Sequence, residues 1–131
     1  MNIDVTEVKL EIYVPEEYIE PIRDALTHIG ACRVGNYDHV MAFHCSRGSW
    51  RPLSGSSPFN GKTGEICFGT EMKMEVRCPV EIVETAVREV KKIHPYEEPV
   101  INVIPLLNIY FKNYQGGDFD VRGFYAIPSA F

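Results

Sequence analysis

Several features that mark other protein classes are missing from this 131-residue sequence. No apolar run approaches the roughly 20 residues that a membrane helix needs, and we expect no signal peptide at the amino end, which lacks a basic and an apolar region. Positive charge is also scarce, because 13 Lys and Arg stand against 18 Asp and Glu, a net charge of −5. An acidic chain of this kind suits neither nucleic acid nor an anionic membrane. We therefore expect neither partner.

Paired cysteine motifs are absent as well. The chain has no C-x-x-C pair, although it contains four cysteines, Cys32, Cys45, Cys67 and Cys78. Zinc sites and redox motifs usually show such paired spacing. Without a secretory signal, the simplest interpretation is a set of reduced, half-buried core residues and a cytoplasmic location.

What the sequence does contain is a distinctive stretch at residues 94–99, His-Pro-Tyr-Glu-Glu-Pro. Pro95 disfavours helical geometry at His94, so the patterned helix before it is expected to end there. Pro99 has no N–H to donate, which suits the first position of a strand. The stretch is therefore expected to join a helix to a strand.

Two segments repeat one pattern of strand, proline and helix. Residues 8–14 and 70–78 alternate apolar and polar positions, which predicts strands with one buried face. After Pro15 and Pro79, apolar residues recur at three- and four-residue steps, as in amphipathic helices. With a further strand after each helix the order is βαββαβ. We predict an α+β, ferredoxin-like sandwich in which a four-stranded antiparallel sheet carries both helices on one face.

Glycine and proline interrupt every periodic pattern in residues 47–69. We expect a long loop here, after a second strand that covers residues 31–35 and 40–46. Loops of this length in a compact domain are usually functional, interface-forming or disordered. The segment Trp50-Arg51-Pro52 includes residue types that are enriched at interface hot spots. It is therefore predicted to contact a partner.

Only one side of the predicted sheet is covered by helices. The other side presents one tyrosine and side chains of both charges on the first and third strands: Lys9, Glu11, Tyr13, Glu71, Lys73, Glu75 and Arg77. It is either a solvated face, since opposite charges on neighbouring strands pair, or a polar contact between subunits. We divide the chain into a domain over residues 1–105 and an apolar extension over 106–131. The extension is expected to fold onto its own sheet or a neighbouring subunit.

A metal site is one candidate function of the polar residues. The ligand candidates are His39, His44 and His94, but their spacing closes no site of three or four ligands. His44 and the adjacent Cys45 point to opposite faces of a strand. A site would need ligands that folding or assembly brings together. The cofactor is unknown, with a divalent metal as the candidate.

A small polar pocket is the other candidate site. Its ligand-binding residues would be Asn36, Tyr37, Asp38, Arg51, His94, Tyr96, Glu97 and Glu98. Tyr96 would pack against the ligand while the glutamates accept hydrogen bonds. His94 lies at a helix C-terminus, where its charged form is favoured. The alternative is that both segments are structural turns, in which Asn36 and Asp38 bond backbone amides.

Several separated motifs, which span about residues 7–106, together resemble a known family. They resemble the domain inserted in the Ngg-interacting-factor-three-like dimetal proteins, and the His-Pro-Tyr-Glu-x-Pro portion is also similar to the copper-tolerance protein CutA. The motifs, in the family's order, are Gly35-Asn36-Tyr37-Asp38, Arg51-Pro52-Leu53, Gly55-Ser56 with Pro58-Phe59, Gly61 and Gly64, and residues 94–99. The resemblance implies a PII/CutA-like fold that usually assembles as a trimer through its sheets.

The histidine- and acid-rich blocks that bind two metals in the full-length relatives are absent from this sequence. We therefore expect no hydrolase activity. The preferred hypothesis is a non-catalytic, oligomeric regulatory or binding module for a small ligand, a metal ion or a protein partner that contacts the 47–69 loop. The alternatives are a copper-type divalent-metal-binding protein similar to CutA and an enzyme of unknown reaction that uses a cleft near Asp38 and His94.

Overall fold

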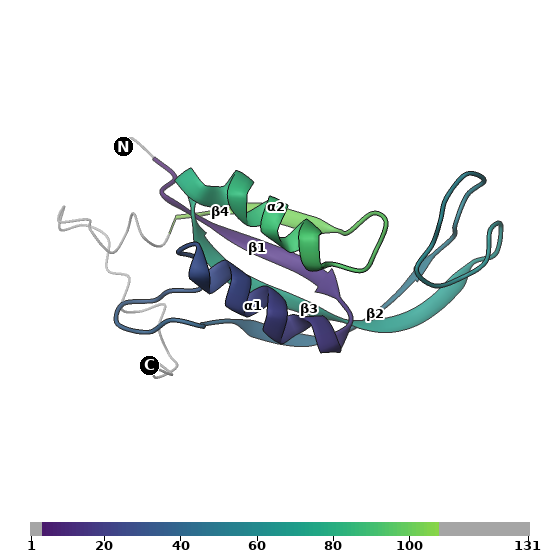
Figure 1. The fold of residues 1–131 in the computed structure, drawn as a ribbon, viewed down its shortest axis with the longest axis horizontal. Helices are drawn as coiled ribbons and strands as arrows, with labels where there is room; N and C mark the ends of the chain where they lie inside the picture. The colour runs from purple at the N-terminus through teal and green to yellow at the C-terminus, as the bar shows by residue number, and fades with distance from the viewer. Residues whose placement is uncertain (1–3, 108–131) are drawn as a thin grey trace, which may run out of the picture.

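The structure is a computed structural model that describes residues 4–107. Its elements are β1 (Glu7–Val14), η1 (Glu16–Tyr18), α1 (Ile19–His28), β2 (Ala42–Trp50), β3 (Cys67–Pro79), η2 (Val80–Ile82), α2 (Val83–Ile93) and β4 (Ile101–Leu106). The strands form one antiparallel sheet in the order β2-β3-β1-β4, and α1 and α2 cover one face of it (Figure 1). The predicted ferredoxin-like fold is confirmed. The extension predicted over 106–131 lies, except for its first two residues, outside the described residues.

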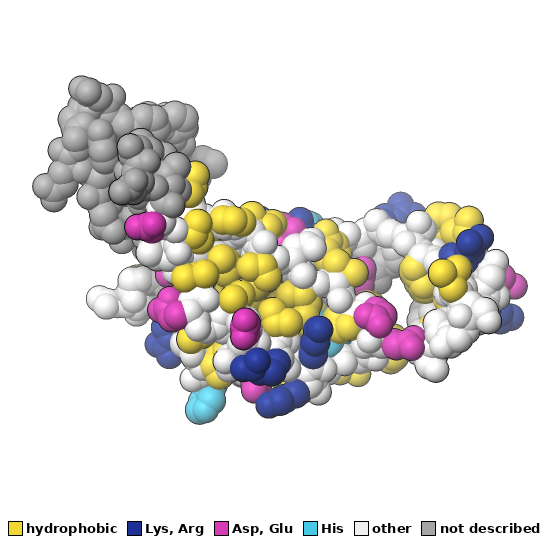
Figure 2. Space-filling view, turned by 90° about the horizontal axis from the view of Figure 1, so that it is seen from above, with side chains coloured by type: hydrophobic (Ala, Val, Ile, Leu, Met, Phe, Trp, Pro, Cys, Tyr) yellow, Lys and Arg dark blue, Asp and Glu magenta, His cyan; other side chains and the backbone are white. Residues whose placement is uncertain are grey.

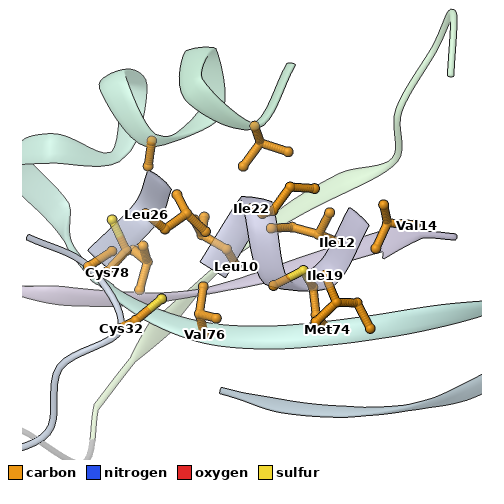
Figure 3. Packing of buried hydrophobic residues seen from close by; sticks show 14 residues of the cluster. Leu10, Ile12, Val14, Ile19, Ile22, Leu26, Cys32, Met74, Val76 and Cys78 are labelled. Carbon is orange, nitrogen blue, oxygen red and sulfur yellow. The ribbon is translucent and has the colours of Figure 1, made fainter. Parts of the chain in front are cut away.

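The hydrophobic core lies between the two central strands and the helices (Figure 3). The alternation predicted for β1 and β3 is present, because Leu10 faces Val76 and Ile12 faces Met74 across the two strands. The fully or almost fully buried residues are Val8, Leu10, Ile12, Val14, Ile19, Ile22, Leu26, Ala31, Cys32, Met74, Val76, Cys78, Ala86 and Val90. Burial of each large aliphatic side chain contributes about 1.5–3 kcal/mol. The core therefore fixes the sheet and both helices, but it does not extend to β2.

The ends of the helices follow the proline and glycine signals. A short 3-10 turn separates Pro15 from α1, and another separates Pro79 from α2. Gly30 adopts a positive φ of 108° just after α1, a conformation that glycine reaches without steric cost. His94 is extended, with φ −63° and ψ 133°, as expected of a residue before proline. The prediction that α2 ends there is confirmed.

The second predicted strand is wrong in its first half. Residues 31–35 contain only an isolated bridge between Val34 and Tyr37 instead of a strand. Cys32 has a positive φ of 59°, which bends the chain away from an extended path. Its N–H still bonds the carbonyl of Arg77, at 2.9 Å, so this connection runs along the edge of the core.

The long loop predicted over residues 47–69 is present over residues 51–66, but its two ends belong to the paired strands β2 and β3. Pairing continues from Arg47 opposite Thr70 to Trp50 opposite Cys67, so the connecting loop is only residues 51–66. The ribbon projects beyond the helices (Figure 1), and all but one residue of β2 is exposed. Both faces of the ribbon meet solvent, so its sequence shows no burial period. We call residues 45–72 the arm and residues 51–66 the arm tip.

No helix in residues 4–107 is both long enough and apolar enough to cross a membrane.

Candidate functional site

The uncovered face of the sheet carries four paired charges at its centre. Glu11 on β1 and Glu75 on β3 lie directly opposite each other in register, an arrangement that destabilises a sheet when it is left uncompensated. Two lysines bridge them. Lys73 Nζ is 3.1 Å from Glu11 Oε2 and 3.5 Å from Glu75 Oε1, and Lys9 Nζ is 3.1 Å and 3.7 Å from the same two oxygens. We call these residues the charge quartet, and its net charge is zero.

Glu11 is the most enclosed member of the quartet, with 8% of its surface exposed. Asn102 on β4 donates a further hydrogen bond to Glu11 Oε1, at 3.5 Å. The ammonium groups of Lys73 and Lys9 hold the pKa of Glu11 below its ordinary value, and Glu11 in turn raises the pKa of Lys73. Glu11 and Lys73 therefore stabilise each other's charged form on a face that no helix of the described chain covers.

The turn after α2 is fixed by His94, which is buried. Its Nε2–H donates to the carbonyl of Tyr13, at 2.7 Å, and its Nδ1 accepts the N–H of Tyr96, at 3.2 Å. This arrangement requires the neutral ring, with the proton on Nε2 because a carbonyl only accepts. Burial lowers the pKa of His94. The expectation that the charged form is favoured is wrong, because loss of hydration outweighs the attraction of the helix C-terminus.

Stability is expected to fall when the pH is lowered through and below 6.5, the ordinary pKa of histidine. The folded-state pKa of His94 is depressed, so in this range the unfolded chain takes up a proton that the folded chain resists. The contribution of neutral His94 to the free energy of unfolding is therefore complete above pH 6.5 and is lost as the pH falls toward the folded-state pKa. The free energy of unfolding changes by at most about 1.4 kcal/mol per pH unit in this range. Urea unfolding between pH 5 and pH 8 measures this slope. A midpoint that rises on acidification in this range would contradict the assignment.

The same turn contacts the arm. Tyr96 Oη donates to Glu71 Oε2 on β3, at 2.8 Å, and its ring lies between His94 and Phe59, with centroids 4.7 Å and 5.6 Å away. Burial and the Glu71 carboxylate raise the pKa of Tyr96, so the phenol stays a donor. Glu97 Oε2 accepts the N–H of Ser57, at 2.8 Å. The turn after α2 and the arm tip, about 40 residues apart in sequence, thus contact each other.

The other half of the predicted pocket lies elsewhere. The loop that holds Asn36, Tyr37 and Asp38 is attached near Arg77, which pairs with Lys9 on β1, whereas His94 is bonded to Tyr13. Four residues along a strand correspond to about 13 Å, so the structure does not bring the two segments into one pocket. Val34 and Tyr37 exchange two backbone hydrogen bonds of 2.9 Å. The segment is therefore a turn that backbone hydrogen bonds hold.

The metal-ligand candidates are also separated. His39 lies in this turn with Nδ1 2.8 Å from Asp38 Oδ1, and it lowers the pKa of Asp38. His44 lies on β2 opposite Lys73, and both ring nitrogens of His94 are already engaged. Within residues 4–107, no three His, Cys, Asp or Glu side chains are grouped so as to hold a metal ion.

The predicted partner segment has a local structural role. The Trp50 indole N–H donates to the carbonyl of Asn60, at 3.0 Å, and its ring covers Gly69, where an added Cβ would lie 3.2 Å from the indole carbons. Pro52 is buried, and its carbonyl accepts the N–H of Gly64, at 2.8 Å. Arg51 is exposed. Trp50 and Pro52 therefore shape the arm tip.

The cysteines are unpaired, and two of them are unsuited to nucleophilic catalysis. Cys32 and Cys78 are fully buried, and burial raises the pKa of each thiol to about 11. Such thiols remain protonated and inert at neutral pH. Cys45 and Cys67 lie on the arm, away from the core, where Cys45 is exposed and Cys67 is half-buried, so only Cys32 and Cys78 are the core residues that were expected.

No family model matches the chain. The chain is 37% identical over 98 residues to the GTP cyclohydrolase 1 type 2 homolog of Bacillus subtilis (strain 168), a match that covers 75% of this chain and 26% of that protein. It thus spans about a quarter of the length of the curated relatives it matches.

Solved structures support the same relationship. The crystal structure of a Bacillus cereus protein related to NIF3 superposes with a TM-score of 0.67 at 27% identity, over 78% of this chain and 26% of that protein. The divalent ion tolerance protein CutA1 from Ehrlichia chaffeensis superposes with a TM-score of 0.59 at 17% identity, over 78% and 82% of the two chains. The second match shows the fold alone. The predicted resemblance to a PII/CutA-like domain of NIF3-related proteins is confirmed.

Proposed function

We propose that this chain, which is similar to the PII/CutA-like domain of NIF3-related proteins, is a non-catalytic binding module. It self-associates as a trimer through the open face of its sheet, and it contacts a small ligand or a protein partner through the arm tip. The observation that carries the proposal is the charge quartet on the uncovered face. Glu11 is 8% exposed there although no helix lies over it.

The quartet supports self-association for two reasons. Its charges cancel within one subunit, so copies that meet at this face do not bring net charge of one sign together. Its acids and bases already satisfy one another, which limits the cost of removing water from them. A second copy is therefore a partner that the face accepts.

The arm supports the partner-binding part of the proposal. Phe68, Ile66 and Leu53 are exposed by 79%, 65% and 61%, although a small domain rarely leaves several large apolar side chains in water without a binding role. Figure 2 shows apolar and basic side chains together at the end of the molecule that the arm forms. The basic residues of this region are Arg47, Arg51 and Lys62. A partner with apolar and acidic groups suits such a surface.

Native mass spectrometry of the protein as isolated tests the proposal. We expect a species of three times 14.9 kDa, the mass of one chain, and any retained ligand appears as additional mass on it. A stable monomer at micromolar concentration would contradict the proposed assembly.

Other functions receive less support from the site. The name of CutA1 points to divalent ions, but His39, His44 and His94 are separated in this chain. The name of the B. subtilis relative points to GTP cyclohydrolase chemistry, but the match covers only 26% of that protein. The proposal keeps the cytoplasmic location, because four unpaired cysteines suit a reducing compartment.

A further inference from the structure

The arm tip is internally rigid, but its attachment to the body is slight. The Trp50–Asn60 bond, the Gly64–Pro52 bond and two bonds from Ser56 to the Leu53 carbonyl hold the tip together. The tip is carried on a two-stranded ribbon outside the core (Figure 1), and such ribbons are marginally stable alone. The orientation of the tip therefore depends on contacts made outside the ribbon.

Two contacts from the turn after α2 supply this restraint. Glu97 Oε2 accepts the Ser57 N–H at 2.8 Å, and the Tyr96 ring lies 5.6 Å from that of Phe59. If the tip moves, Tyr96 does not follow it, because its N–H is bonded to His94 in the body and its Oη to Glu71, which lies opposite Ser46 at the foot of the arm and outside the tip. One side of the contact thus belongs to the fixed body and the other to a rigid tip.

We infer that Glu97 and Tyr96 form a latch that holds the arm tip against the α2–β4 turn, and that opening of this latch regulates the arm's access to a partner. The hydrogen bond is exposed, so solvent competes for both of its groups, and the closed form is only modestly favoured. An open state is then populated at roughly 0.1–10%. Some partners would bind Phe59 more strongly than Tyr96 binds it. Such a partner shifts the population toward the open state. The regulatory role rests on the proposed function of the tip. The existence of the latch does not depend on that function.

Hydrogen exchange followed by mass spectrometry tests the latch in Glu97→Ala and Phe59→Ala. We expect the Ser57 amide to exchange about five to ten times faster in Glu97→Ala, since one exposed charge-assisted hydrogen bond is lost. Trypsin cleavage after Lys62, within the tip, is expected to accelerate in both variants. Exchange in β1 should not change. Glu98→Ala is the matched control, because it removes the neighbouring exposed carboxylate.

The inference is overturned if a Phe59→Ala, Glu97→Ala double variant shows exchange and cleavage equal to those of Glu98→Ala. Native mass spectrometry of the same samples separates this outcome from the proposed assembly. If the double variant retains the wild-type number of subunits and the tip is loosened, the latch acts independently of assembly, as we infer. If wild type is itself monomeric, the proposed assembly fails, and the exchange rates alone decide on the latch.

Discussion

Replacement of Glu11 by Gln is expected to weaken subunit association by about 100-fold or more, because removal of one partner of a buried ion pair leaves the other uncompensated. In this variant Lys9 and Lys73 lose the oxygen that lies 3.1 Å from each of them. The change adds one positive charge per subunit at the face where copies would meet. Within an isolated subunit the lysines still reach water, so the fold should be retained. Sedimentation velocity over a concentration series measures the association.

Two further variants make the Glu11 test specific. Glu84→Gln is the same chemical change on the exposed side of α2, and we expect it to associate like wild type. Adding Lys9→Met to Glu11→Gln restores the charge balance and should recover part of the lost association. If Glu11→Gln associates as strongly as Glu84→Gln, the quartet does not lie in an interface.

Replacement of His94 by Ala is expected to lower the free energy of unfolding by about 2–4 kcal/mol. The Tyr13 carbonyl and the Tyr96 N–H would each lose a partner in a partly buried position, which costs up to about 1–3 kcal/mol per group, and the missing ring leaves a cavity. Urea unfolding monitored by circular dichroism gives the value. The same variant should lose the fall in stability below pH 6.5, because it removes the group that titrates.

His44→Ala is the matched control for His94→Ala. His44 is exposed on β2, so its replacement should change stability by no more than about 0.5 kcal/mol. A loss in His94→Ala no larger than this would show that the ring does not fix the turn. A retained acid dependence in His94→Ala would assign the titration to another group.

The charge quartet could be read from the sequence once the repeat was recognised. Lys9 and Glu11 recur 64 positions later as Lys73 and Glu75, the same offset as Pro15 to Pro79. The two repeats are neighbours in the sheet and antiparallel, so equivalent residues approach one another about a pseudo-twofold axis. Glu11 then faces Glu75. Alternation predicted which face these residues occupy, and the repeat predicts that they meet.

The arm and its latch could not be predicted in the same way. Alternation of apolar and polar residues indicates a strand only when one of its faces is buried. β2 beyond the core is buried on neither face, so its sequence does not alternate and predicts a loop. The Ser57–Glu97 contact joins residues 40 positions apart and depends on how the ribbon leaves the sheet. The charge of His94 was mispredicted for a related reason. The helix dipole is a local effect that sequence reveals, whereas the burial of His94 and its bond to the Tyr13 carbonyl are tertiary effects.

The central claim is that copies of this chain meet at the open sheet face, and acetylation of lysines over a dilution series tests it most directly. Lys9 and Lys73 lie on that face, whereas Lys91 and Lys92 are exposed on α2 and serve as internal references. We predict that Lys9 and Lys73 react slowly in concentrated protein and faster on dilution, while the α2 lysines react at a constant rate. Labelling of Lys9 and Lys73 that is independent of concentration, in a protein whose mass changes with concentration, would show that the copies meet elsewhere.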